Sequence, residues 1–447
     1  MMKIIDHALK SREADGRPLR VALVGAGFAA RGVAHQLLMP LTGMRLAAIV
    51  NRTTGKAKRL FEERQLTPVC VESAEQFNEA VAASVPVVTS DIALAARSPQ
   101  IDVIVDCTGQ VEYGAHVALA AIQGGKPLVM ANAELDATLG PILKRRADAA
   151  GVTISNTDGD EPAVAMNLYR SVETMGFRIV MAGNIKGFLD VHRNPDTQRE
   201  FAESVGQKPA MIVSFADGTK LSFESAILAN ATGLAVSRRG MTGFQLKHAM
   251  DLPAVLSTDE LLLKPRVDYI LGAEPGNGAF VLAHSDEPIT QQYMQYFKMG
   301  DGPLYLFYTP FHLPTIQFSA TIARVALFDD AAVTPSGPPA AEVVAVAKRD
   351  LSAGTTLDGI GGFDCYGTIE DAHVARRDQL LPMGIASDCT LLRDIVQDEP
   401  LTYADVELPH GRLCDRLREE QDAWLGEQPS HRETRSGIRD RPSLVRA

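Results

Sequence analysis

Short apolar runs alternate with longer amphipathic stretches through the first part of the chain. Apolar runs occupy 19–24 and 45–50, and helical patterns such as 29–38 follow them. This alternation of strand and helix is typical of a doubly wound parallel sheet with helices on both faces. We therefore predict the α/β class, with a Rossmann domain over residues 1–155.

The pattern changes after residue 155. Strand-like runs follow there without intervening helical periods, at 211–223, 279–283, 304–308 and 316–319. The first of these alternates about Asp217-Gly218, a dipeptide that predicts a β-hairpin. We predict an α+β catalytic and dimerisation domain over residues 156–335.

A Pro- and Gly-rich stretch at 334–339 predicts a linker into a third domain. The apolar run that follows it begins a small β-rich unit, which we place at 340–425. The last residues, 426–447, are polar and Arg-rich, and we expect them to form a tail.

Composition narrows the class of protein. The 447 residues carry a net charge of −11, which argues against a nucleic-acid or anionic-membrane surface. The five cysteines show no metal-binding spacing, as expected for free thiols in a reducing cytosol. We find no apolar stretch of membrane-spanning length and no secretion signal, so we expect a cytoplasmic protein.

The first apolar run leads directly into a glycine-rich turn, Gly25-Ala26-Gly27-Phe28-Ala29-Ala30. Gly25 permits the tight turn, Gly27 lets the backbone approach a pyrophosphate, and Ala30 allows close packing of helix and strand. The N-terminus of the following helix offers free N–H groups to the anion. The motif predicts a dinucleotide site, and an ordinary tight βα turn is the alternative.

The end of the second strand distinguishes between two cofactors. An NAD-specific fold usually places Asp or Glu here, whereas this chain has Asn51 and Arg52. A guanidinium can bind a 2′-phosphate that an acid would repel, so NADPH is favoured. The alternative is that Arg52 is a solvated residue opening the next helix. Further cofactor contacts are expected at the same sheet edge, from Thr108, Gly109 and Asn132.

An acidic loop follows the predicted nucleotide domain. Asp158, Asp160 and Glu161 lie around Gly159 at the carboxyl end of a strand, where open α/β sheets bind their ligands. Such carboxylates can hold a divalent cation or keep one proton for acid catalysis. Alternatively, Asp160 or Glu161 caps the helix that Pro162 begins.

A lysine between two glycines stands at the end of a later strand. Asn184 and Lys186 share one side of the segment if it is extended. Lys186 is our first candidate for polarising a substrate oxygen, and a surface lysine in a turn is the alternative. Arg193 lies nearby and can line the same cleft.

Two adjacent arginines, Arg238 and Arg239, are flanked by small hydroxyl and glycine residues. With Arg193, they are candidates to anchor a substrate phosphate. Charge pairing with the acidic loop explains them almost as well. The segments 272–278 and 311–314, the second with His312, are expected to border the cleft.

The chain resembles the homoserine-dehydrogenase-like oxidoreductases that carry a C-terminal SAF (β-clip) domain. The resemblance covers nearly the whole length and rests on the following segments: Val24-Gly25-Ala26-Gly27, Asp106-Cys107-Thr108-Gly109, Gly125-Lys126-Pro127, Met130-Ala131-Asn132-Ala133-Glu134, Ala347-Lys348-Arg349-Asp350-Leu351, Ala353-Gly354 and Leu401-Thr402-Tyr403-Ala404-Asp405-Val406. One departure is Ala133, where homoserine dehydrogenases have a lysine. Plain homoserine oxidation is therefore not expected.

Within that group the chain is similar to reductoisomerase-like enzymes. This resemblance implies NADPH-dependent conversion of 1-deoxy-D-xylulose 5-phosphate to 2-C-methyl-D-erythritol 4-phosphate, an isoprenoid precursor of the methylerythritol phosphate pathway. It also implies inhibition by fosmidomycin, a homodimer, and Mg²⁺ or Mn²⁺ bound by Asp158, Asp160 and Glu161. One alternative is a dehydrogenase of another hydroxy acid or sugar acid, and a second is a non-catalytic NADP(H)-sensing module.

Overall fold

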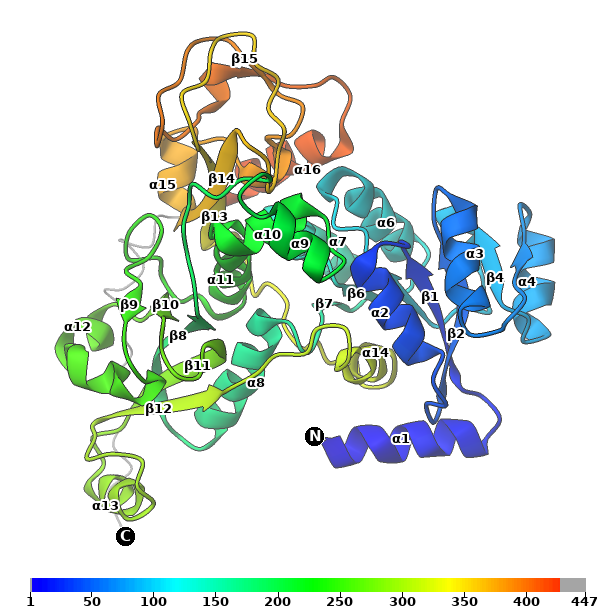
Figure 1. The fold of residues 1–447 in the computed structure, drawn as a ribbon. Coiled ribbons are helices and arrows are strands. Elements are labelled where there is room, and N and C mark those ends of the chain that lie inside the picture. The colour runs from blue at the N-terminus through cyan, green and yellow to red at the C-terminus, as the bar shows by residue number, and fades with distance from the viewer. Residues whose placement is uncertain (1, 427–447) are drawn as a thin grey trace.

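The computed structural model describes residues 2–426. The chain builds a large parallel sheet, a smaller mixed sheet and a β-rich C-terminal region, which occupy different parts of Figure 1. The predicted tail, 426–447, lies outside the described residues from 427 onward. No helix within the described span is long and apolar enough to cross a membrane.

The first sheet has seven parallel strands in the order β3-β4-β2-β1-β5-β6-β7. Its strands are β1 (Leu19–Val24), β2 (Met44–Val50), β3 (Val69–Cys70), β4 (Val87–Thr89), β5 (Val103–Asp106), β6 (Leu128–Met130) and β7 (Ile154–Asn156). The accompanying helices are α1 (Met2–Ala14), α2 (Phe28–Leu37), α3 (Thr54–Glu62), α4 (Ala74–Ala82), α5 (Ile92–Arg97), α6 (Val111–Gln123) and α7 (Ala133–Ala149).

Side chains alternate between two cores along β1. Leu19, Val21 and Leu23 pack with α2 and α3 on one face, whereas Ala22 and Val24 enter the core on the other. A parallel strand buried on both faces reads as a continuous apolar run, as β1 does. The Rossmann-type sheet and the α/β class predicted from this pattern are confirmed.

The second sheet has the order β12-β11-β8-β10-β9 and mixes parallel and antiparallel pairs. Its strands are β8 (Arg178–Lys186), β9 (Phe244–Gln245), β10 (Arg266–Leu271), β11 (Asn277–His284) and β12 (Leu304–Thr309). Its helices are α8 (Glu161–Thr174), α9 (Arg199–Ser204), α10 (Pro209–Ala216), α11 (Thr219–Thr232), η1 (Ala249–Val255), α12 (Thr258–Leu263), α13 (Pro288–Tyr296) and α14 (Phe318–Leu327). Of these, α14 returns to pack on the first sheet.

The C-terminal region (residues 340–426) consists of two small two-stranded sheets and short helices. Its elements are β13 (Ala341–Ala347), β14 (Cys365–Asp371), α15 (Ala372–Arg377), η2 (Met383–Ile385), β15 (Thr390–Leu391), η3 (Tyr403–Asp405), β16 (Val406–Glu407) and α16 (Leu413–Gly426). In Figure 1 it sits above α11, and α16 reaches across to the helices of the first sheet.

Two predictions about local structure are wrong. Residues 211–223 form no hairpin, because Asp217-Gly218 joins α10 to α11, and the left-handed Gly218 (φ +84°) ends one helix and begins the next. Almost every residue of α11 is buried, so its sequence shows no helical period. The segment 316–319 likewise leads into α14 and forms no strand.

Candidate functional site

The glycine-rich turn has the geometry of a dinucleotide site. Gly25 has φ +114°, and a Cβ there would lie 2.8 Å from the carbonyl oxygen of Cys107. Gly27 is the N-cap of α2, its side-chain direction faces open space, and no side chain caps the helix. The first N–H groups of α2 are therefore available to an anion, as a bound pyrophosphate requires. The residues present fit a dinucleotide.

The end of β2 presents an exposed cation beside a second helix start. Arg52 is exposed, and α3 begins two residues later without a side-chain cap. The Nδ2 of the neighbouring Asn51 donates to the carbonyl of Thr53 at 2.8 Å. An uncapped helix start and a free guanidinium form a suitable surface for a phosphate.

The loops after β5 and β6 are tied to each other. Asn132 Nδ2 donates to Asp106 Oδ2 at 2.8 Å, and Asn132 Oδ1 caps α7 by accepting from Leu135 N. Thr108 Oγ1 donates to the other oxygen of Asp106 at 2.7 Å. Burial raises the pKa of Asp106 in spite of these hydrogen bonds. Asn132 therefore holds this edge in shape from a fully buried position, and Gly109 (φ +60°) continues the turn.

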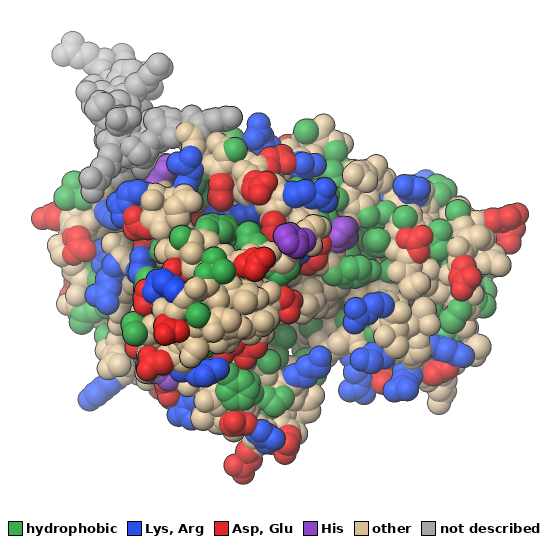
Figure 2. All heavy atoms as spheres, turned by 90° about the horizontal axis from the view of Figure 1, so that it is seen from above, with side chains coloured by type: hydrophobic (Ala, Val, Ile, Leu, Met, Phe, Trp, Pro, Cys, Tyr) green, Lys and Arg blue, Asp and Glu red, His purple; other side chains and the backbone are tan. Residues whose placement is uncertain are grey.

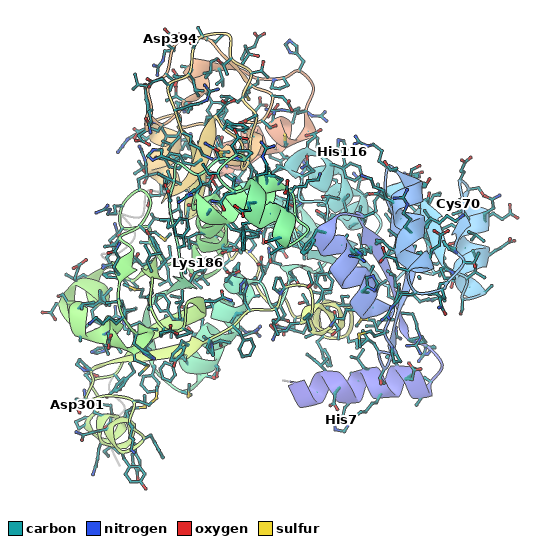
Figure 3. The ribbon with its side chains drawn as sticks, in the orientation of Figure 1. His7, Cys70, His116, Lys186, Asp301 and Asp394 are labelled. Carbon is teal, nitrogen blue, oxygen red and sulfur yellow. The ribbon has the colours of Figure 1, made fainter. Side chains whose placement is uncertain are left out.

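A buried cluster of charged groups lies where β7 leads into the second sheet. Four elements build it, and its members are Asp160 and Glu161 at the start of α8, Asn184 and Lys186 on β8, Lys220 and Glu224 on α11, and Glu134 on α7. Lys186 Nζ donates to Glu161 Oε1 and, at 3.1 Å, to Glu224 Oε2. Figure 3 places Lys186 in the middle of the molecule. We call this set the charged cluster.

The extended backbone of β8 determines where the side chains of Lys186 and Asn184 lie. Both side chains lie on the same side of the strand and meet Glu224, to which Asn184 Nδ2 donates at 2.7 Å. The Lys186 side chain is 18% exposed, so most of it lies inside the molecule. Burial opposes the charge of Lys186, but Glu161 and Glu224 outweigh it and raise its pKa.

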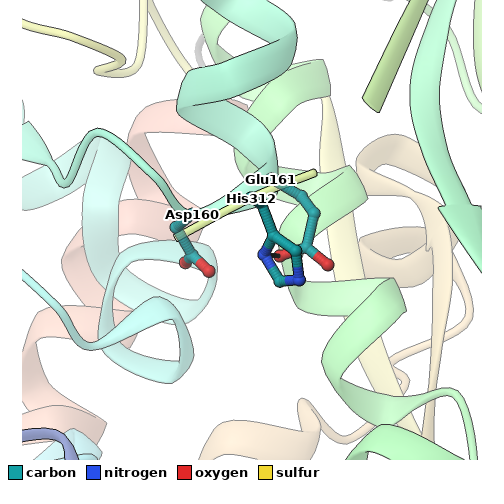
Figure 4. A group of neighbouring side chains, drawn as sticks. All are labelled: Asp160, Glu161 and His312. Carbon is teal, nitrogen blue, oxygen red and sulfur yellow. Dashed lines mark ion pairs between the residues drawn. The ribbon is translucent and has the colours of Figure 1, made fainter. Parts of the chain in front are cut away.

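Glu161 is joined from the other side by His312. Glu161 Oε2 lies 2.8 Å from His312 Nδ1, yet neither atom has a hydrogen-bond partner in the described chain. Gly159 (φ +87°) makes this approach possible, because a Cβ there would lie 2.4 Å from the carbonyl oxygen of Leu313. Figure 4 shows Asp160, Glu161 and His312 turned toward one another. Their ligand atoms all lie within 4.8 Å of each other.

The carboxyl groups of the charged cluster differ in the direction in which their surroundings shift the pKa. Burial would raise the pKa of Glu161, but Lys186 and His312 hold it well below its usual value. Burial and the nearby Glu161 charge instead raise the pKa of Glu224. Burial also raises the pKa of Asp160, although Lys220 opposes part of that rise. The carboxyl groups of the cluster are therefore shifted in opposite directions, with the pKa of Glu161 lowered and those of Glu224 and Asp160 raised.

Asp158 does not join this group. Its carboxylate accepts from Asn167 Nδ2 at 2.7 Å and from Thr321 Oγ1 at 3.1 Å, and it pairs with Arg324 at 3.3 Å. These partners tie the loop to α8 and α14. The predicted carboxylate set is thus divided, with His312 standing where Asp158 was expected. At the N-cap of α8, the Asp160 side chain makes no capping hydrogen bond, so it is not used as a helix cap.

Two of the three arginines proposed for a phosphate form ion pairs elsewhere. Arg239 Nε donates to Glu370 in β14 at 2.8 Å, and Arg193 Nε donates to Asp190 at 2.9 Å. Arg238 is exposed next to Arg239. Figure 2 shows basic and acidic side chains interspersed over the face in view. The structure brings none of the three into the charged cluster.

Sequence reasoning missed Lys220, Glu224 and Glu134 as site residues. Lys220 Nζ lies 3.7 Å from Glu134 Oε1, directly after the position where Ala133 stands in place of the usual lysine. Burial opposes the charge of Lys220, but Glu134 and Asp160 raise its pKa. The incorrect hairpin prediction hid Lys220 and Glu224, because it treated this segment as a pair of strands and not as the buried helix α11.

Two protein-family models match parts of the chain. Residues 25–156 match the NAD-binding domain of homoserine dehydrogenase, and residues 159–318 match the catalytic domain described as oxidoreductase DRL. Neither match extends into the C-terminal region. No curated protein matches the chain.

Solved structures with a similar fold are distant. The oxidoreductase yvaA of Bacillus subtilis is 18% identical over 44% of this chain and 51% of its own, with a TM-score of 0.26. A dehydrogenase of Thermotoga maritima is 12% identical over 59% and 72%, with a TM-score of 0.36. The scyllo-inositol dehydrogenase of Lactobacillus casei with NAD(H) and scyllo-inositol is 12% identical over 60% and 74%, with a TM-score of 0.36. The chain spans about half the length of the first of these.

The dinucleotide turn and the two family matches together define the class of this protein. It has a Rossmann domain with the turn of a dinucleotide site, followed by a domain that matches the catalytic domain of an oxidoreductase.

Proposed function

We propose that this enzyme uses NADPH to reduce the carbonyl of a small polyhydroxylated substrate, or NADP⁺ to oxidise the corresponding alcohol, as in dehydrogenases of hydroxy acids and sugar acids. The observation that carries the proposal is Lys186, a buried ammonium between two carboxyl groups. The carboxyl ends of β5, β6 and β7 lead from the dinucleotide turn toward this lysine. Arg52 supports the choice of the phosphorylated cofactor.

In this proposal the cofactor and each residue of the site have separate roles in the reaction. The bound dinucleotide supplies or accepts the hydride. Lys186 Nζ faces the reacting oxygen, donates a hydrogen bond to it, and gives up a proton as the alcohol forms. Glu161 and Glu224 hold the ammonium in place, and substrate hydroxyl groups can donate to the same carboxylates.

A second candidate is reductoisomerisation of 1-deoxy-D-xylulose 5-phosphate, which the arrangement of Asp160, Glu161 and His312 favours. Each of these three residues offers one ligand atom, and the three atoms lie within 4.8 Å of one another. The closest approach is 2.8 Å, between Glu161 Oε2 and His312 Nδ1. A divalent cation fits this donor set and, when bound, would hold and polarise the two oxygens of a hydroxyketone.

One assay separates the two candidates. NADPH consumption is measured with 1-deoxy-D-xylulose 5-phosphate and Mg²⁺ or Mn²⁺, with and without fosmidomycin. In parallel, NADPH formation from NADP⁺ is measured with a panel of sugar acids and polyols, with and without fosmidomycin. Turnover of a sugar acid that fosmidomycin leaves unchanged supports the dehydrogenase. Fosmidomycin-sensitive turnover of the sugar phosphate supports the reductoisomerase. NADPH binding without any hydride transfer would contradict both and leave a sensing module.

We also propose that two copies associate through α13. This helix projects from the β11–β12 connection (Figure 1), none of its residues is buried, and it carries no charged side chain. Tyr293, Tyr296 and Phe297 are 58%, 77% and 66% exposed. In a chain with a net charge of −11, an uncharged aromatic face is where two copies repel each other least.

A further inference from the structure

Two helices supply the charged-cluster residues that lie beyond α8 and β8. Lys220 and Glu224 belong to α11, and Glu134 belongs to α7. We propose that the C-terminal region is a positioning element for the active site, and that Lys348 sets the start of α11 and thereby the places of Lys220 and Glu224. The inference rests on the proposed function, because it assigns these residues to the reacting site.

The start of α11 depends on a buried ion pair with the C-terminal region. Lys348 Nζ lies 2.9 Å from Asp217 Oδ2, and the two side chains are 2% and 0% exposed. The other oxygen of Asp217 accepts from Thr219 N at 2.9 Å, at the first residue of α11. Lys348 also donates to the carbonyl of Gly362 at 2.9 Å, which anchors it within its own region. One carboxylate thus joins the helix start to Lys348.

The backbone of β14 holds the same helix turn. Gly367 N donates to Thr219 Oγ1 at 2.8 Å, and Ser222 Oγ donates to the carbonyl of Gly367 at 3.2 Å. A side chain at Gly367 would collide with Thr219, at 2.9 Å. The close approach of β14 therefore leaves α11 little freedom to slide or rotate.

The position of this turn decides where the charged groups point. Lys220 directly follows Thr219, and Glu224 lies about one helical turn later on the same face. Glu224 in turn accepts from Lys186 at 3.1 Å and from Asn184 at 2.7 Å. A shift of α11 would consequently misplace two cluster members and loosen the hold on Lys186.

The experiment uses the full chain with Lys348→Met, the double variant Lys348→Met/Asp217→Asn, and Arg377→Met as the control. Arg377 belongs to the same region but forms an exposed ion pair with Asp378. The double variant removes both buried charges, while the amide oxygen introduced by Asp217→Asn can still accept from Thr219 N. Three quantities are measured: kcat and KM with the accepted substrate, the Kd for NADPH, and hydrogen–deuterium exchange of peptides from α11 and from the β1–α2 turn.

We expect Lys348→Met to lower kcat on the order of tenfold to a hundredfold, as a displaced catalytic group does. Exchange should rise in residues 219–224 but not in the β1–α2 turn, and the Kd for NADPH should stay within about twofold. The double variant should recover most of kcat, and Arg377→Met should match the wild type.

Unchanged kcat and unchanged exchange in Lys348→Met would overturn the inference. Parallel losses of kcat, NADPH binding and protection in both segments would also overturn it, because they indicate general destabilisation. If Lys348→Met does not fold, the double variant decides: normal protection of α11 with normal kcat supports the positioning role, and raised exchange in both segments opposes it. Hydrogen–deuterium exchange is measured without a substrate, so it tests the positioning role independently of the reaction. If the enzyme turns over none of the substrates, only the proposed function is contradicted.

Discussion

Gln421 completes the backbone hydrogen bonds of a helix to which it does not belong: its Nε2 donates to the carbonyl of Thr138 at 3.0 Å. The same amide accepts from Ile142 N through Oε1 at 3.0 Å. These two backbone groups would bond to each other in an unbroken α-helix. Pro141 interrupts α7 at this point, and the fully buried Gln421 of α16 fills the opening.

We expect Gln421→Leu to destabilise the protein by about 1–3 kcal/mol. The buried N–H of Ile142 loses its acceptor, and the carbonyl of Thr138 keeps only the longer contact from Arg418 Nη1 at 3.4 Å. Urea unfolding followed by circular dichroism measures the change. Glu420→Gln is the control, because Glu420 makes only a surface ion pair with Arg146 and should cost at most about 1 kcal/mol. Equal effects of the two substitutions would show that the inserted amide contributes nothing particular.

Lys186→Met tests the proposed proton donor. Because Lys186 donates to the substrate oxygen but lies away from the dinucleotide turn, we expect kcat to fall about a hundredfold to ten-thousandfold. The Kd for NADPH, measured by its fluorescence, should hardly change. Lys247→Met, at an exposed lysine, should leave both quantities at the wild-type level. Turnover that survives in Lys186→Met would remove this lysine from the reaction.

Arg52→Ala tests the choice of cofactor. Loss of a charge-assisted contact to the 2′-phosphate should weaken NADPH binding about tenfold or more and leave NADH binding unchanged. Titration of each cofactor by calorimetry compares the two. Arg59→Ala, in the last turn of α3, is the matched control. If Arg52→Ala weakens the binding of both cofactors equally, Arg52 does not recognise the 2′-phosphate.

Asp136 makes stability fall as the pH rises. Burial raises its pKa to about 7, although Asn156 Nδ2 donates to it at 3.1 Å. The folded chain keeps this proton between about pH 4 and pH 7 whereas the unfolded chain loses it, so the free energy of unfolding declines across that window. Between about pH 5 and pH 8, the free energy of unfolding of Asp136→Asn should therefore fall by about 2 kcal/mol less than that of the wild type. Asp148→Asn, at an exposed site of the same helix, should behave like the wild type.

The dimer proposal predicts a monomer when α13 is charged. Tyr296→Glu together with Phe297→Glu should shift the mass measured by light scattering from two chains to one, because each glutamate would be buried against its copy. Met39→Glu, at a residue that is 51% exposed on the Rossmann side, should leave the mass unchanged. A wild-type chain that is already monomeric would contradict the proposal.

Local sequence signals were sufficient wherever a structure depends on neighbouring residues. The apolar run of β1, the turn at Gly25 and the start of α2 follow one another, so backbone sterics and strand burial determine them together. The sequence placed Asn184 and Lys186 on one side only on the condition that their segment is extended, and β8 continues through Lys186. Where burial surrounds a helix, as in α11, this signal vanishes and the pattern imitates a strand.

The sequence by itself determined the Rossmann sheet, the dinucleotide turn and the candidacy of Lys186. Only the tertiary structure decided that His312 joins Glu161, that Asp158 leaves the cluster for Arg324, and that Lys220 stands beside Glu134. These contacts join segments far apart in the chain, and they depend on how α8, α11 and α14 pack. The electrostatic field of a buried site is a property of that packing, because each charge is stabilised or suppressed by neighbours from other elements.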